Sequence, residues 1–136
     1  MGVLSAKTTM LAIAHALEDN AVVTKAWPYP MEGPDVGQAV VGYPREFTLG
    51  SAGAFQRTHD KATFTVLIVA GIADVEETMD VVDQLLGEGA VAVRDAIEAD
   101  LSDVVAFVNV SRGSVERLLL GKVPHAAVRY DVEVTA

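Results

Sequence analysis

The stretch from Lys61 to Gly89 changes from a strand pattern to a helix pattern within a few residues. It reads KATFTVLIVAGIADVEETMDVVDQLLGEG. Phe64, Val66 and Ile68 occupy alternate positions, which places them on one face of a strand running from Lys61 to Ile72. The second half of this strand is apolar on both faces, so we expect it to lie in the centre of a sheet, with a helix directly after it.

Helical spacing predicts two or three helices. The first runs from about Ser5 to Glu18, with Ser5 as its N-cap and Leu11, Ala14 and Leu17 on one face. The second runs from about Val75 to Leu86 and ends at Gly87. We expect its core stripe to consist of Val75, Met79, Val82 and Leu86. A further helix, from about Ala90 to Glu98, places Val93 and Ile97 four residues apart.

Shorter apolar runs predict the remaining strands. They are Val22–Trp27, Gln38–Tyr43 with a continuation at Glu46–Leu49, Asp103–Ser111 ended by Gly113, and His125–Thr135. In the last one, Val128, Tyr130, Val132 and Val134 alternate with Arg129, Asp131 and Glu133, so the first set is expected to face the core. Residues 28–37 hold three prolines and two glycines, which predicts a loop. Residues 51–60 predict a hairpin loop.

The order of these elements indicates the fold class. A chain of 136 residues is long enough for one domain with one hydrophobic core. Strands and helices do not alternate regularly, so an α+β fold is expected. We predict a single domain over residues 1–136, with a mostly antiparallel sheet of about five strands and two to three helices packed on one face.

Composition excludes several functions. The formal net charge of −9 argues against binding nucleic acid through its phosphates. The absence of cysteine excludes disulfides and thiolate metal sites and fits folding in a reducing cytoplasm. The sequence contains neither a secretory signal nor a run of about 20 apolar residues, so no membrane association is expected. The hydrophobic fraction of 51% suggests burial against other subunits as well as in the core.

Catalytic motifs are not found. His15, His59 and His125 have no metal-binding neighbour at the usual spacings, and a separate structural role is expected for each. The glycines of GEGAVAVRD follow a helix, whereas a dinucleotide-binding loop follows a strand. The serines lack the context of a nucleophile elbow. We therefore expect neither an enzyme nor a cofactor.

Acidic residues are concentrated in the middle of the chain. Between Asp74 and Asp100 there are nine carboxylates and one base, Arg94. Acids at the start of a helix are stabilised by its dipole. Asp80 and Asp83 have no lysine or arginine at i+3 or i+4 to balance them. Two interpretations remain open, an ordinary solvated helix face and a functional acidic surface.

Four features together resemble the tail terminator proteins of long-tailed, siphovirus-type bacteriophages, in particular those of actinobacteriophages. They are the amphipathic SAKTTMLAIAHALED, the aromatic and proline-rich VTKAWPYPMEGPDVGQAVVGYPREF, the strand and acidic helix of RTHDKATFTVLIVAGIADVEETMDVVDQLL, and the alternating AAVRYDVEV. The similarity covers nearly the whole chain. It concerns the order of elements, and it provides no diagnostic residue.

The resemblance implies a structural protein of the virion. Proteins of this family form a hexameric ring on the last ring of the tail tube. They stop its polymerisation and join the tail to the head–tail connector. The expected partners are therefore other copies of this chain, the major tail tube protein and a connector or head-closure protein. Assembly is expected in the host cytoplasm, and DNA is expected to pass through the ring without specific binding.

This role suggests two candidate surfaces. The first is an interface between subunits or rings. Its candidate residues are Trp27, Tyr29 and Met31 in the proline-rich segment and Arg57 and His59 in the 50–60 loop. The second is an acidic surface formed by Glu76, Glu77, Asp80 and Asp83. We hypothesise that some of these four face either the DNA channel, where they would repel phosphate, or an adjoining basic ring.

Other functions remain open. Head-closure and tail-completion proteins are similar in size and in α+β character. A small non-viral module that binds a ligand or peptide between the sheet and the loop around Trp27 is a second alternative. An enzyme would need a pair of carboxylates from residues 74–100 in a cleft, one of them with a raised pKa.

Overall fold

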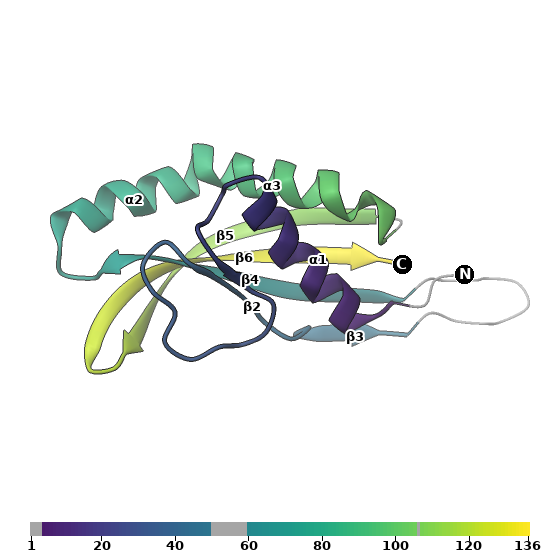
Figure 1. Ribbon diagram of the computed structural model, residues 1–136, viewed down its shortest axis with the longest axis horizontal. Coiled ribbons are helices and arrows are strands. Elements are labelled where there is room, and N and C mark those ends of the chain that lie inside the picture. Colours follow the sequence, from purple (N-terminus) through teal and green to yellow (C-terminus); the bar gives the residue numbers. More distant parts are fainter. Residues whose placement is uncertain (1–3, 50–59, 106) are drawn as a thin grey trace, which may run out of the picture.

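The computed structural model describes residues 4–49, 60–105 and 107–136, and it has an α+β fold (Figure 1). Its elements are α1 (Ala6–Asp19), β1 (Ala26–Trp27), β2 (Ala39–Val41), β3 (Glu46–Thr48), β4 (Lys61–Ile72), α2 (Glu76–Leu86), α3 (Glu88–Asp100), the 3-10 turn η1 (Leu101–Asp103), β5 (Phe107–Leu120) and β6 (Val123–Thr135). The predicted fold class is confirmed at this level.

The sheet has six strands within the described residues. Their order is β1-β2-β4-β6-β5, and β3 pairs with β4 beyond the end of β2. Only β1 and β2 are parallel, and every other pair is antiparallel. β4 and β6 pair over nearly their whole lengths, as do β6 and β5, so these three strands form the main body of the sheet.

β4 confirms the prediction most closely, because it begins and ends at the predicted residues. Phe64, Val66 and Ile68 are buried on the face that the helices cover. They lie directly opposite Val132, Tyr130 and Val128 of β6. These cross-strand pairs form the floor of the hydrophobic core.

α1 starts as the sequence predicts, with the Ser5 hydroxyl accepting a hydrogen bond from the Thr8 amide at 3.2 Å. Its packed face differs slightly from the prediction. Leu11 is exposed, whereas Met10, Ile13 and Leu17 are buried in the core together with Ala14. This face contacts β1, β2 and α3, which places α1 and α3 together on one side of the sheet (Figure 1).

α3 continues from α2 after a short break at Gly87. The predicted pair Val93 and Ile97 is completely buried against α1 and β5. α2 packs less closely, on β4 and β6. In α2 the predicted core stripe is wrong for Val75, Met79 and Leu86, whereas Val82 packs against the core. Met79 and Leu86 are exposed, Val82 is half-buried, and the buried residue is Thr78.

The reason is a polar anchor at the start of α2. The Thr78 hydroxyl donates a hydrogen bond to the Ile72 carbonyl at 2.8 Å. It also lies against Gly71, where an added Cβ would come within 2.5 Å of that hydroxyl. The anchor turns Thr78 and Leu85 toward the sheet. Val75, Met79 and Leu86 are left on the flank of the helix.

Two strand predictions also need correction. β1 comprises only Ala26–Trp27, the end of the expected strand. β5 does not stop near Gly113 but runs on to Leu120, with a bulge between Val110 and Arg112. A glycine weakens a strand by only about 1 kcal/mol, which the continuous pairing with β6 outweighs.

Candidate functional site

The face of the sheet opposite the helices carries a line of charged side chains, and we call it the open face. The Arg129 guanidinium lies 2.7 Å from the Glu116 carboxylate of β5. On its other side, Arg129 Nε is 3.7 Å from Oδ1 of Asp131. Oδ2 of Asp131 accepts a hydrogen bond from Arg45 Nη2 at 3.3 Å. Charges of alternating sign therefore extend from β5 across β6 to the segment before β3.

Asp131 is the buried member of this line, since its side chain is only 7% exposed. Two arginines flank it, so the cost of burying the carboxylate is offset by opposite charge. Its hydrogen bond and its ion pairs are formed with these two arginines, and Thr65 lies opposite it on β4. The arrangement links β6 to the segment before β3.

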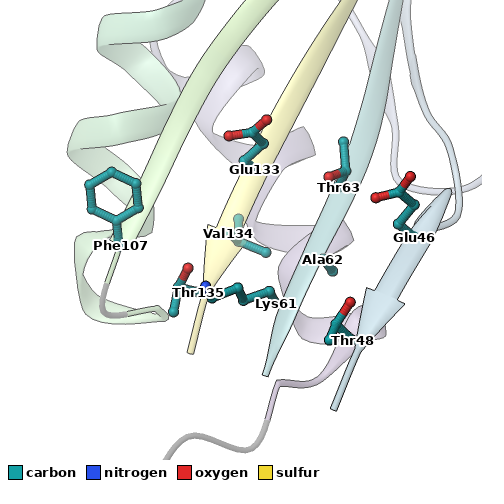
Figure 2. Close-up of a pocket in the computed structure, with 9 residues that line it drawn as sticks. All are labelled: Glu46, Thr48, Lys61, Ala62, Thr63, Phe107, Glu133, Val134 and Thr135. Atoms are coloured by element: carbon teal, nitrogen blue, oxygen red, sulfur yellow. The ribbon is translucent and has the colours of Figure 1, made fainter. Parts of the chain in front are cut away.

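Two shallow hollows lie beside this line. One, of about 450 Å³, is lined by Arg45, Thr65, Leu67, Glu116 and Arg129, among others. The second, of about 350 Å³, lies nearer the carboxyl end of β6 (Figure 2). There Glu46, Thr63 and Glu133 form one row across β3, β4 and β6. The Cα atoms of Glu46 and Glu133 are separated by two strand spacings, about 10 Å.

This line of charges was missed at the sequence level. Alternation along His125–Thr135 correctly predicted that Arg129, Asp131 and Glu133 leave the core. It gave no indication that Asp131 is buried on the open face. The signal is absent because Arg45, its hydrogen-bond partner, is 86 positions away.

The four predicted acidic residues all lie on α2. Glu76, Glu77, Asp80 and Asp83 are exposed, and none forms an ion pair within the part of the chain that the structure describes. Asp80 and Asp83 also line an open hollow of about 430 Å³ with Gln84, Gly87 and Glu88. The structure thus brings Asp80 and Asp83 together on the outer side of α2, away from the sheet.

The predicted aromatic surface around β1 is only partly exposed. Tyr29 is exposed, whereas Trp27 and Met31 are half-buried. The Trp27 indole donates a hydrogen bond to the Gln38 side chain at 3.1 Å, and Lys25 Nζ lies 5.0 Å from the ring centre. Met31 lines a hollow with Leu118 and Leu120 of β5. Arg57 and His59 fall outside the described residues.

Among the residues that the structure describes, Tyr130 has a resolved change of pKa. Burial beneath α2 raises its pKa to about 12, because the phenolate would lose its hydration. Its hydroxyl donates a hydrogen bond to the Leu85 carbonyl near the end of α2. This is a packing role and suggests no chemistry.

Metal sites and membrane-spanning helices are both absent from residues 4–49, 60–105 and 107–136. No three His, Asp or Glu side chains are placed to hold a metal ion. In the same ranges, the helices are too short or too polar to span a membrane. Comparison with known protein families and with curated proteins finds no family and no individual protein that matches this chain.

Proposed function

We propose that this chain is a structural subunit of a bacteriophage tail, a tail terminator that assembles into a ring. The ring caps the tail tube, stops its polymerisation and joins the tail to the head–tail connector. One geometric observation supports this function above others. The subunit has exposed apolar side chains at both lateral edges of its sheet.

β5 forms one of these edges, since it pairs only with β6 within the described residues. It exposes Phe107 and Leu119. The opposite edge is formed at one end by β3, where Phe47 and the adjacent Leu49 are exposed. An exposed strand edge with apolar side chains is ready to pair with another chain.

Two different edges on one subunit favour head-to-tail assembly. When the β5 edge of one copy meets the β3 edge of the next, the contact is heterologous, and it closes into a ring if the rotation per subunit permits. The sequence resemblance adds the expected stoichiometry of six and the identity of the neighbouring rings. The major tail tube protein and a head-closure protein are the partners in this proposal, and the virion neck is its place.

Two measurements test this proposal. Light scattering combined with electron microscopy of the purified chain is expected to show closed rings. Added to polymerising tail tube protein, the chain is expected to shorten the tubes in proportion to its concentration, which another neck component would not do. A Phe47→Lys variant places a charge on the exposed β3 edge and is therefore expected to form fewer rings and to shorten the tubes less than the wild type. Rings without an effect on tube length would favour another neck component, and a monomer without any effect would contradict the proposal.

A further inference from the structure

α2 presents an apolar surface to solvent, although its sequence is amphipathic. Val75, Met79 and Leu86 are all exposed, Met79 to 71%. We call these three residues the α2 strip. A methionine that is exposed to this extent, on a helix that has apolar contacts elsewhere, is typical of an interaction surface.

The strip continues onto β5. A Cβ added at Gly113 would lie 3.5 Å from the Leu86 side chain, so Leu86 rests above Gly113. Val115 is two residues further along the same face of β5, and it is also exposed. The apolar surface therefore spans a helix and the strand beside it.

Unbalanced acids border the strip. Asp83 is four residues after Met79, which places it about 40° further around the helix. Glu76 and Asp80 lie on the same outer side. None of the three has an ion-pair partner within the described residues. A partner for this surface must therefore combine apolar side chains with positive charge.

Such a partner exists in the chain itself. β5 and β6 are joined by a tight turn at Gly121 and Lys122, with Gly121 at φ +66°. We call residues 117–123 the hairpin tip. Leu119 is 69% exposed there, on the same face of β5 as Arg117. Arg117 and Lys122 are exposed and have no carboxylate partner within the described residues.

The hairpin tip does not reach the α2 strip of its own molecule. In Figure 1 the hairpin, drawn in yellow and light green, curves away from the helices, and α2 lies on the other side of the sheet's end. We infer that the α2 strip and its acids receive the hairpin tip of a second copy of this chain. Leu119 would pack on Met79 and Leu86. Arg117 and Lys122 would pair with Asp80 and Asp83.

This inference rests on the proposed ring, for which it names a contact. The two surfaces differ, so the contact is heterologous and every subunit gives one tip and receives another. A hairpin tip alone buries less than the roughly 1,200–2,000 Å² of a stable interface, so it acts together with the sheet edges. Its charges add specificity and speed to the encounter.

Reversing the charges on each side tests the contact. The first variant carries Asp80→Lys and Asp83→Lys, and the second carries Arg117→Glu and Lys122→Glu. Each alone is expected to weaken self-association by about tenfold or more, because like charges then face each other. A 1:1 mixture of the two is expected to restore assembly, since each strip again meets a tip of opposite charge. The control, Asp19→Lys with Asp95→Lys, makes the same change of charge as the first variant at exposed positions on α1 and α3, and it is expected to assemble like the wild type.

Sedimentation velocity gives the readout at low and high salt, and circular dichroism checks that each variant is folded. Because the chain has no cysteine, Met79→Cys and Leu119→Cys chains provide a second readout. Mixed and oxidised, they are expected to form a crosslinked pair between the two variants. If the wild type assembles and the charge reversals have no effect, this contact is overturned and the proposed ring remains. The same holds if the 1:1 mixture does not recover assembly. A wild type that stays monomeric would overturn the ring and the contact together.

Discussion

Tyr130 links the sheet to α2, since its ring packs in the core and its hydroxyl donates to the Leu85 carbonyl. We predict that Tyr130→Phe lowers the free energy of unfolding at pH 7 by about 1 kcal/mol, because the Leu85 carbonyl loses its partner. The measurement is urea unfolding followed by circular dichroism. A variant as stable as the wild type would show that water replaces this hydrogen bond at no cost.

The same residue predicts a loss of stability in alkali. The pKa of Tyr130 is raised to about 12 in the folded state, while an unfolded tyrosine ionises near 10. Between pH 10 and 12 the unfolded chain therefore binds fewer protons than the native chain, so the stability from this group falls as pH rises. Between pH 9 and pH 11, the free energy of unfolding should fall more for the wild type than for Tyr130→Phe. An equal fall in the two proteins would contradict the raised pKa of Tyr130.

Asp131 is expected to matter more than its neighbours on the open face. Asp131→Asn removes the charge that lies between Arg45 and Arg129 and should destabilise the fold by about 1–3 kcal/mol. Glu133→Gln, two residues along the same face, changes an exposed carboxylate and should stay within about 0.5 kcal/mol. Urea midpoints measured for both variants decide this. Equal effects would mean that the line of charges contributes no more than a solvated surface.

At the scale of elements, the sequence predicted those strands and helices whose hydrophobic pattern matches their burial in the folded structure. β4 and the core face of β6 followed from alternation, because one face of each strand is buried throughout. α2 was predicted in the right place, but the helix is rotated so that Thr78 and Leu85 face inward in place of Met79 and Leu86. Hydrophobic periodicity finds an apolar stripe, but a single hydrogen bond from Thr78 and the space above Gly71 decided which side packs. A hydrogen bond from a side chain to the backbone leaves no signal in the hydrophobic periodicity.

The rotation of α2 leads to a direct test. Thr78→Val removes only the hydroxyl, leaves the Ile72 carbonyl without its donor, and is expected to cost about 1 kcal/mol of stability. Met79→Gln changes the exposed residue that periodicity assigns to the core, and it should change stability by less than about 0.5 kcal/mol. Thermal unfolding of dilute, monomeric protein is the measurement. A larger loss of stability for Met79→Gln than for Thr78→Val would support the core stripe predicted from the sequence.

At the scale of the whole molecule, the sequence pattern of one chain does not identify the surfaces that contact other chains. The hydrophobic fraction suggested burial against other subunits, and the structure leaves apolar side chains exposed on the sheet edges and on α2. The candidate surfaces are therefore formed by residues that local periodicity assigned either to the core or to no role. Phe107 and Leu119 are examples on β5.

Assembly should also make stability depend on protein concentration. Association favours the folded state by mass action, so a 100-fold increase in concentration adds about 2.7 kcal/mol to a chain that assembles only when folded. For a domain of this size, that should raise the melting temperature by roughly 5–10 °C. Phe107→Lys puts a charge on the exposed β5 edge, and its melting temperature should stay constant over the same range. Scanning calorimetry at both concentrations measures this. If the melting temperature of the wild type does not change with concentration, folding is not coupled to ring formation. That result would show that the exposed edges do not associate.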